Sequence, residues 1–64
     1  MRQWLKDARE ALEITQEEIA ELAGIKQSAY CVIELGLRNP SVKVAQRIGK
    51  FLKVKWTTFY TEGR

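Results

Sequence analysis

The side chains best suited to chemistry in this chain form a short polar run, Lys26, Gln27 and Ser28, with Val32 one helical turn after Ser28. The Gln27 amide can bond to both N6 and N7 of adenine. Lys26 can reach guanine or a phosphate, Ser28 can bond most base edges, and Val32 can contact a thymine methyl group. Residues four apart share a face of a helix, so these side chains act together only if a helix presents them.

The segment around this run, residues 16–33, is typical of two short helices joined by a tight turn. Ala20 and Ala23 belong to the apolar face of a first helix, and Gly24 follows at once. A residue that ends a helix there tends to need a positive φ, which glycine adopts without steric cost. The apolar pattern resumes through Tyr30 in a second helix. This is the helix-turn-helix pattern, whose second helix lies in the DNA major groove.

The composition of the chain argues against a metalloprotein, an enzyme and a membrane protein. The 64 residues predict one small domain spanning residues 1–64. With no histidine and with Cys31 as the single cysteine, the chain offers no metal-ligand cluster and no nucleophile–histidine pair. We therefore expect no catalytic residue, no metal and no cofactor. No stretch is long enough to cross a bilayer and the N-terminus lacks a signal-peptide core, so a cytoplasmic protein is predicted.

Charge is unevenly distributed along the chain. Residues 1–34 carry four basic and seven acidic side chains, whereas residues 35–64 carry seven basic and one acidic. A basic half favours a surface that faces a polyanion, although a solvated lysine face has the same appearance in a sequence. We interpret Arg47, Lys50, Lys53 and Lys55 as solvated charges.

Hydrophobic spacing and capping signals predict four helices and a short last helix or turn. They cover residues 2–13, 16–23, 26–35, 42–52 and 56–62. Thr15 and Glu18 form a capping box for the second helix, and Ser41 is expected to cap the fourth. The tail from Glu62 to Arg64 is expected to fray.

The apolar stripes of these helices predict the residues of the core. Tyr30 is expected in the core with its hydroxyl reaching an edge. The other expected inward-facing residues are Leu5, Ala8, Leu12, Ile14, Val44, Ile48, Phe51, Leu52 and Val54, with Trp56, Phe59 and Tyr60 as anchors of the last element.

At this point the chain resembles the Cro and XRE type of helix-turn-helix regulators, the phage-repressor family. The resemblance covers Trp4 to Tyr60 and rests on ITQEEIAELAGIKQSAYCVIELGLRNPS followed by VKVAQRIGKFL. The closing VKWTTFY is similar to the end of some short phage and mobile-element regulators. The resemblance implies an all-α, compact five-helix lambda-repressor-like domain, with the helix-turn-helix at about residues 16–35 and a recognition helix at 26–35.

The resemblance also implies a role for each matching residue. It places Lys26, Gln27, Ser28 and Val32 against the bases. It places Gln16, Arg38, Asn39, Ser41 and Lys43 against phosphates. It matches Arg9 and Glu34 to a structural pair that ties the first helix to the third.

Some positions depart from the family pattern. Leu35 and Leu37 stand where relatives often carry a polar residue and a lysine, which weakens the expected phosphate clamp. Val32 replaces a common basic or polar residue, which reduces the hydrogen bonds available to bases. Lys55 stands where related endings often have an aspartate cap, so the last helix is expected to begin less sharply.

We therefore expect a sequence-specific regulator that binds double-stranded DNA, a repressor of a phage or mobile-element type. The expected partner is a palindromic operator bound by a homodimer, with no membrane and no small-molecule substrate. Leu35, Leu37 and the acidic N-terminal half keep an alternative open, namely a protein-interaction module such as an antitoxin or an anti-repressor target built on the same fold. An enzyme is disfavoured, because a domain of this size has little room for a pocket.

Overall fold

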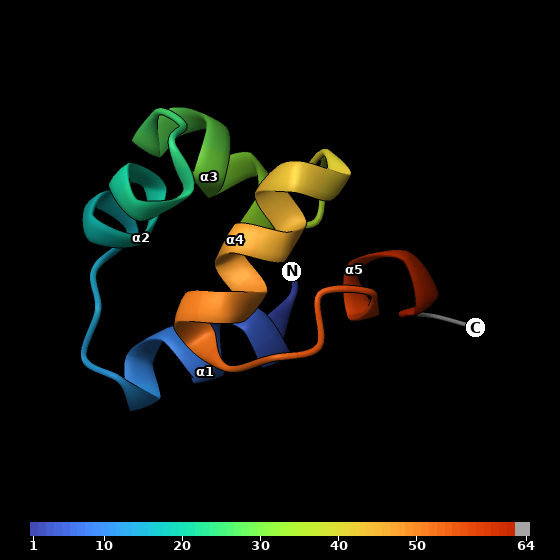
Figure 1. Cartoon of the computed structure of the whole chain (residues 1–64), viewed down its shortest axis with the longest axis horizontal. Helices are drawn as coiled ribbons and strands as arrows, with labels where there is room; N and C mark the ends of the chain where they lie inside the picture. Colours follow the sequence, from blue (N-terminus) through green and yellow to red (C-terminus); the bar gives the residue numbers. More distant parts are fainter. Residues whose placement is uncertain (63–64) are drawn as a thin grey trace.

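The computed structural model describes residues 1–62, which contain five helices and no strand. The helices are α1 (Gln3–Ala11), α2 (Gln16–Ala23), α3 (Gln27–Glu34), α4 (Val42–Leu52) and α5 (Thr58–Thr61). Helix α2 packs against both α3 and α4, and α1 packs against α3 (Figure 1). This architecture confirms the predicted all-α fold of five helices. None of the helices in residues 1–62 is long and apolar enough to cross a membrane.

Side-chain caps define the starts of α2 and α4. The Thr15 hydroxyl accepts from the backbone N–H of Glu18 at 3.1 Å, and the Glu18 carboxylate accepts from the Thr15 N–H at 3.0 Å. The bond from the Thr15 backbone lowers the pKa of Glu18. At α4 the Ser41 hydroxyl accepts from the N–H of Val44 at 3.3 Å. Both predicted caps are therefore confirmed, and each satisfies an N–H that a helix start leaves without a partner.

Helix α1 is shorter than the sequence predicted. It ends at Ala11, because Glu13 adopts a positive φ of 55° that is incompatible with a helix. The turn lets the N–H of Ile14 bond to the carbonyl of Arg9 at 3.2 Å and directs Ile14 toward the core. The expected inward position of Leu12 is wrong, since this residue caps the helix and is 40% exposed.

A core of ten buried apolar residues fills the space between the helices. Its members are Leu5, Ile19, Ala20, Ala23, Tyr30, Ile33, Ala45, Ile48, Leu52 and Phe59. Phe51 was expected among them and is instead 37% exposed. Successive residues are offset by about 100° around a helix. Ala45 therefore lies on the same buried face of α4 as Ile48 and Leu52, whereas Phe51 lies to one side of that face.

The segment after α4 folds back over the body and places its aromatic rings as predicted. Phe59 is buried and meets Trp4 edge to face, with ring centroids 5.0 Å apart. The Tyr60 hydroxyl donates to the carbonyl of Pro40 at 2.6 Å, which ties α5 to the loop before α4. Helix α5 begins after Thr57, whose side chain makes no cap hydrogen bond, so the start of this helix lies two residues beyond the Lys55 position at which the family pattern places a cap.

The expectation of a frayed tail is wrong for Glu62. Its carboxylate lies 2.6 Å from Nε of Arg2 and accepts a hydrogen bond from Nε1 of Trp4 at 2.5 Å. The charge of Arg2 is buried, so this partner holds the residue in place. Gly63 and Arg64 lie outside the described residues.

Candidate nucleic-acid interface

The turn between α2 and α3 sets the direction of α3. Gly24 has a φ of 77°, as its position predicted, and Ile25 donates its N–H to the carbonyl of Ala20 at 3.0 Å. From α4, Nη1 of Arg47 donates to the carbonyl of Ala23 at 3.2 Å. The interpretation of Arg47 as a merely solvated charge is therefore wrong, because it caps the end of α2 and braces the turn.

Helix α3 projects its first turn from the body. Lys26, Gln27 and Ser28 are all exposed, whereas Tyr30 and Ile33 on the opposite face are buried. Lys26 is the N-cap residue of α3, and its side chain is exposed. The polar run is thus presented on one end of a helix whose other face is fixed in the core.

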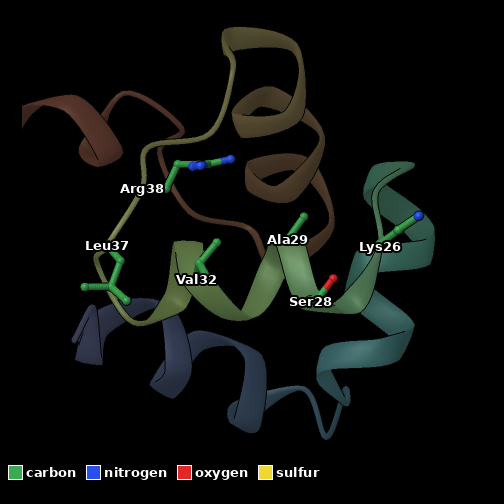
Figure 2. Close-up of a pocket in the computed structure, with 6 residues that line it drawn as sticks. All are labelled: Lys26, Ser28, Ala29, Val32, Leu37 and Arg38. Carbon is green, nitrogen blue, oxygen red and sulfur yellow. The ribbon is translucent and has the colours of Figure 1, made fainter.

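A hollow of about 430 Å³ lies between α3 and the loop that follows it (Figure 2). The structure brings together four of the predicted site residues here, Lys26, Ser28, Val32 and Arg38, and leaves Gln27 outside the lining. The hollow also contains Ala29, which sequence reasoning missed, and Leu37, which it had named only as a departure from the family's phosphate clamp. The spacing of Ala29, three residues before Val32, was the signal that could have found it.

The loop after α3 is held from below by the buried side chain of Arg2. Its Nη1 donates to the carbonyls of Ile33 and of Arg38, the latter at 3.0 Å, and its Nη2 donates to Oδ1 of Asn39. The amide oxygen of Asn39 therefore faces inward, while the side chain of Arg38 is exposed. The sequence did not predict this role for Arg2, because its hydrogen-bond partners lie more than thirty residues away along the chain.

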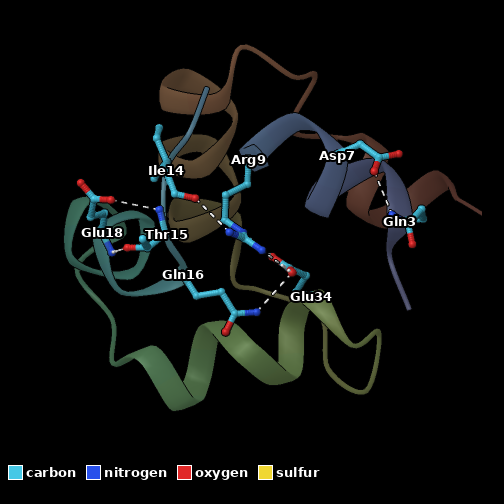
Figure 3. A network of polar contacts seen from close by, with 8 residues as sticks. All are labelled: Gln3, Asp7, Arg9, Ile14, Thr15, Gln16, Glu18 and Glu34. Atoms are coloured by element: carbon cyan, nitrogen blue, oxygen red, sulfur yellow. Dashed lines mark hydrogen bonds and ion pairs between the residues drawn. The ribbon is translucent and has the colours of Figure 1, made fainter. Parts of the chain in front are cut away.

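Gln16, expected at a phosphate, is half-buried at the start of α2. Its Nε2 donates to Oε1 of Glu34 at 3.2 Å (Figure 3). That bond uses one of the two amide hydrogens, so a second donor remains for an anion, together with the backbone N–H groups of Gln16 and Glu17. Ser41 and Lys43 are exposed at the start of α4, on the far side of the loop.

An ion pair joins α1 to the end of α3 behind the interface. Nε of Arg9 lies 3.0 Å from Oε2 of Glu34, and Nη2 donates to Oε1 at 3.1 Å. Burial alone would raise the pKa of the Glu34 carboxyl, but the hydrogen bonds from Arg9 and Gln16, together with the nearby Tyr30 hydroxyl, outweigh burial and lower this pKa.

The Tyr30 hydroxyl lies inside this cluster. The side chain is fully buried, so the expectation that the hydroxyl reaches an edge is wrong. Burial, and then the carboxylate of Glu34, raise the pKa of Tyr30 far above its ordinary value. The hydroxyl therefore stays neutral and takes part in packing.

The fold defines a class of protein, the small all-helical domains in which a tight turn joins the two helices of a helix-turn-helix. A family model described as helix-turn-helix matches residues 5–59. The chain therefore belongs to the helix-turn-helix family of the Cro type, whose members are DNA-binding transcriptional regulators, and the resemblance seen in its sequence is confirmed.

Several curated relatives support this assignment. The HTH-type transcriptional regulator YqaF of Bacillus subtilis, itself described as uncharacterized, is 45% identical over 62 residues, which are 97% of this chain and 82% of that protein. An uncharacterized HTH-type regulator of Methanocaldococcus jannaschii is 38% identical over 55 residues, 86% of this chain and 83% of the relative. Another from Archaeoglobus fulgidus is 34% identical over 55 residues, 86% of this chain and 78% of the relative. No solved structure matches the chain.

Proposed function

We propose that this chain is a sequence-specific regulator that inserts the first turn of α3 into the major groove of double-stranded DNA. The observation that carries the proposal is the exposure of Lys26, Gln27 and Ser28 on a helix whose opposite face is buried. The major groove is about 12 Å wide and admits one α-helix. In this arrangement Gln27 reads adenine, while Lys26, Ser28 and Val32 contact neighbouring base edges.

Phosphate contacts on both sides of α3 fix its register in the groove. Gln16 uses its second amide hydrogen, and Arg38 extends its exposed guanidinium from the loop. Asn39 acts through its amide N–H₂, because its oxygen is held by Arg2. Ser41 and Lys43 complete the contacts at the start of α4. Such contacts supply affinity and orientation but carry no sequence information.

Residues 1–64 act as a single DNA-binding domain, and two copies bind a palindromic operator as a homodimer in the cytoplasm. One recognition helix offers few base contacts, and twofold pairing doubles them. The half-sites then lie one helical turn apart, about 34 Å. Repression of a phage or mobile-element promoter requires only that the operator be occupied, which suits a domain of this size.

A gel-shift titration tests the proposal. A duplex selected from random oligonucleotides should bind about 10³-fold more tightly than random DNA, with an affinity that falls steeply as salt rises. Equal affinity for selected and random duplexes would contradict sequence-specific binding.

Exposed leucines favour a second candidate, a protein-interaction module on the same fold. Leu37 is 77% exposed and Leu35 is 41% exposed. This candidate predicts that a pull-down recovers one stoichiometric protein partner, and that the chain has no DNA affinity at moderate salt.

A further inference from the structure

The loop between α3 and α4, residues 35–41, is anchored to the body by one buried cation. Nη1 of Arg2 donates to the carbonyl of Arg38 at 3.0 Å, and Nη2 donates to Oδ1 of Asn39. The Arg2 side chain is only 3% exposed. Its backbone N–H also donates to the carbonyl of Glu34, at 2.8 Å, where α3 ends. The loop that carries two of the proposed phosphate contacts is therefore attached to the start of α1.

These bonds determine which polar groups Arg38 and Asn39 keep free for a phosphate. A guanidinium group has only donors, so the amide oxygen of Asn39 faces Arg2 and the N–H₂ group is directed away from it. The backbone carbonyl of Arg38 is held in the same way, while its side chain is exposed and extends from the loop beside the hollow (Figure 2). Each residue thus has one polar group bound inside and a donor left outside.

The charge of Arg2 is balanced from the other end of the chain. Oε1 of Glu62 lies 2.6 Å from Nε of Arg2, and Oε2 accepts from Nε1 of Trp4 at 2.5 Å. A buried cation that loses its counter-charge is strongly unfavourable, so Glu62 keeps the guanidinium under the loop. The Tyr60 hydroxyl, on the same segment, donates to the carbonyl of Pro40 at 2.6 Å. The end of the chain therefore supports the loop at two points.

We propose that Arg2 and Glu62 are positioning residues for DNA binding, which hold residues 35–41 in the conformation that brings Arg38 and Asn39 to a phosphate. The inference rests on the proposed function and deepens it. A loop is mobile unless it is held, and holding it in its bound conformation raises affinity because the cost of ordering it no longer falls on the binding step.

The two positioning residues act from behind the DNA-binding surface. Arg2 is buried, and Glu62 carries a charge that phosphates repel. Their effect on DNA therefore passes through Arg38 and Asn39. Phosphate contacts carry no sequence information, so loss of this support should weaken binding and leave the base preference unchanged.

Methylphosphonate substitution of single phosphates in the selected duplex tests the proposal, because it removes one charge and leaves the bases intact. At the phosphate that Arg38 contacts, the wild type should lose about tenfold in affinity, and Arg38→Ala should lose much less. Arg2→Lys keeps the charge and lacks the planar fork, so it should reduce the loss at that phosphate to below about threefold. Glu62→Gln should reduce it in the same direction. When Arg38→Ala is already present, Arg2→Lys should have no further effect on this loss.

The ratio of affinities for the normal and the substituted duplex separates positioning from stability. Partial unfolding lowers the apparent affinity for both duplexes by the same factor and leaves their ratio unchanged. Glu10→Gln removes the same charge as Glu62→Gln from the exposed side of α1 and is the matched control, which should keep the wild-type ratio. If Arg2→Lys does not fold, the comparison of Glu62→Gln with Glu10→Gln decides the question.

Sequence-specific binding with the same loss at that phosphate in wild type, Arg2→Lys and Glu62→Gln would overturn this inference and leave the proposed function intact. Specific binding in which no phosphate depends on Arg38 would also overturn it, since the loop would then have no contact to position. A changed base preference in Glu62→Gln would contradict the assigned role in the same way. Failure of the wild type to prefer any duplex would overturn both the inference and the proposed function.

Discussion

The guanidinium of Arg9 on α1 and the carboxylate of Glu34 at the end of α3 meet through two parallel N–H···O bonds of 3.0 and 3.1 Å. The Glu34 side chain is 2% exposed, and Gln16 of α2 donates to the same carboxylate. Three helices therefore meet at one buried charge. Because α3 carries the proposed base contacts, this pair contributes to holding those residues in place.

Arg9→Ala should destabilise the domain severely. Removal of the arginine leaves the Glu34 carboxylate buried without its counter-charge, at a cost of about 3–5 kcal/mol. Urea unfolding followed by circular dichroism measures the loss. Glu10→Ala, on the exposed side of the same helix, is the matched control and should change the free energy of unfolding by less than about 0.5 kcal/mol. Similar values for the two variants would show that the pair contributes little.

Stability should fall in acid partly through Glu34. The pKa of this group in the folded chain lies below its ordinary value of 4.5, so the folded state holds the charged form and its stabilisation is complete above that pH. The stabilisation is lost as pH falls through the lower, folded pKa. Thermal unfolding of Glu34→Gln should show a flatter pH dependence below pH 4.5 than the wild type.

The exposed Glu21→Gln serves as the control for this titration and should leave the pH dependence unchanged. Glu18, whose pKa is also lowered, accounts for a share of the acid sensitivity that remains in Glu34→Gln. If the unfolding temperatures of Glu34→Gln and wild type fell with pH in parallel, protonation of Glu34 would not contribute to the loss of stability in acid.

Gly49→Ala should destabilise the domain although alanine favours helices. A Cβ at this position would lie 2.8 Å from the carbonyl oxygen of Val54 and 3.0 Å from Cβ of Trp56. Overpacking of this kind costs about 1–3 kcal/mol and exceeds the gain in helix propensity. Gln46→Ala, exposed on the same helix, should be neutral or slightly stabilising in the same chemical unfolding assay. A Gly49→Ala variant as stable as Gln46→Ala would mean that the segment after α4 packs less closely.

Leu37→Lys should strengthen binding to all duplexes alike. The new cation lies beside Arg38 at the margin of the hollow and adds about one phosphate contact, so the salt dependence of log K should steepen by about 0.9. Glu10→Gln changes the net charge by the same amount on α1 and is the control. Fluorescence anisotropy at several salt concentrations gives both slopes. Equal slopes for the two variants would place Leu37 away from the phosphates.

Local signals explain how much of the fold the sequence predicted. The capping and turning roles of Thr15, Gly24 and Ser41 could be predicted from the sequence, because each acts on groups within four residues along the chain. Arg2 could not be read this way, because its partners meet only when the chain has folded. The early end of α1 at Ala11 depends on the positive φ of Glu13, a conformation that the residue types of this turn do not predict.

The sequence predicted the candidate site to about the same extent as it predicted the fold. The polar tip of α3 follows from periodicity alone, since residues on one face of a helix share their exposure. The position of Leu37 depends on the positive φ of Gly36, which lets the N–H of Leu37 bond to the carbonyl of Val32. Which of these residues contact bases depends on DNA, and neither the sequence nor the fold contains that partner.

The central claim, that the tip of α3 reads bases, is tested most directly by comparing the sequences that wild type and Gln27→Ala select from random duplexes. Gln46→Ala, an exposed glutamine on α4, is the matched control. We predict that Gln27→Ala loses its preference at one base pair in each half-site, at a cost of about 1–3 kcal/mol there, while Gln46→Ala keeps the wild-type profile. Identical profiles for all three proteins would contradict the claim.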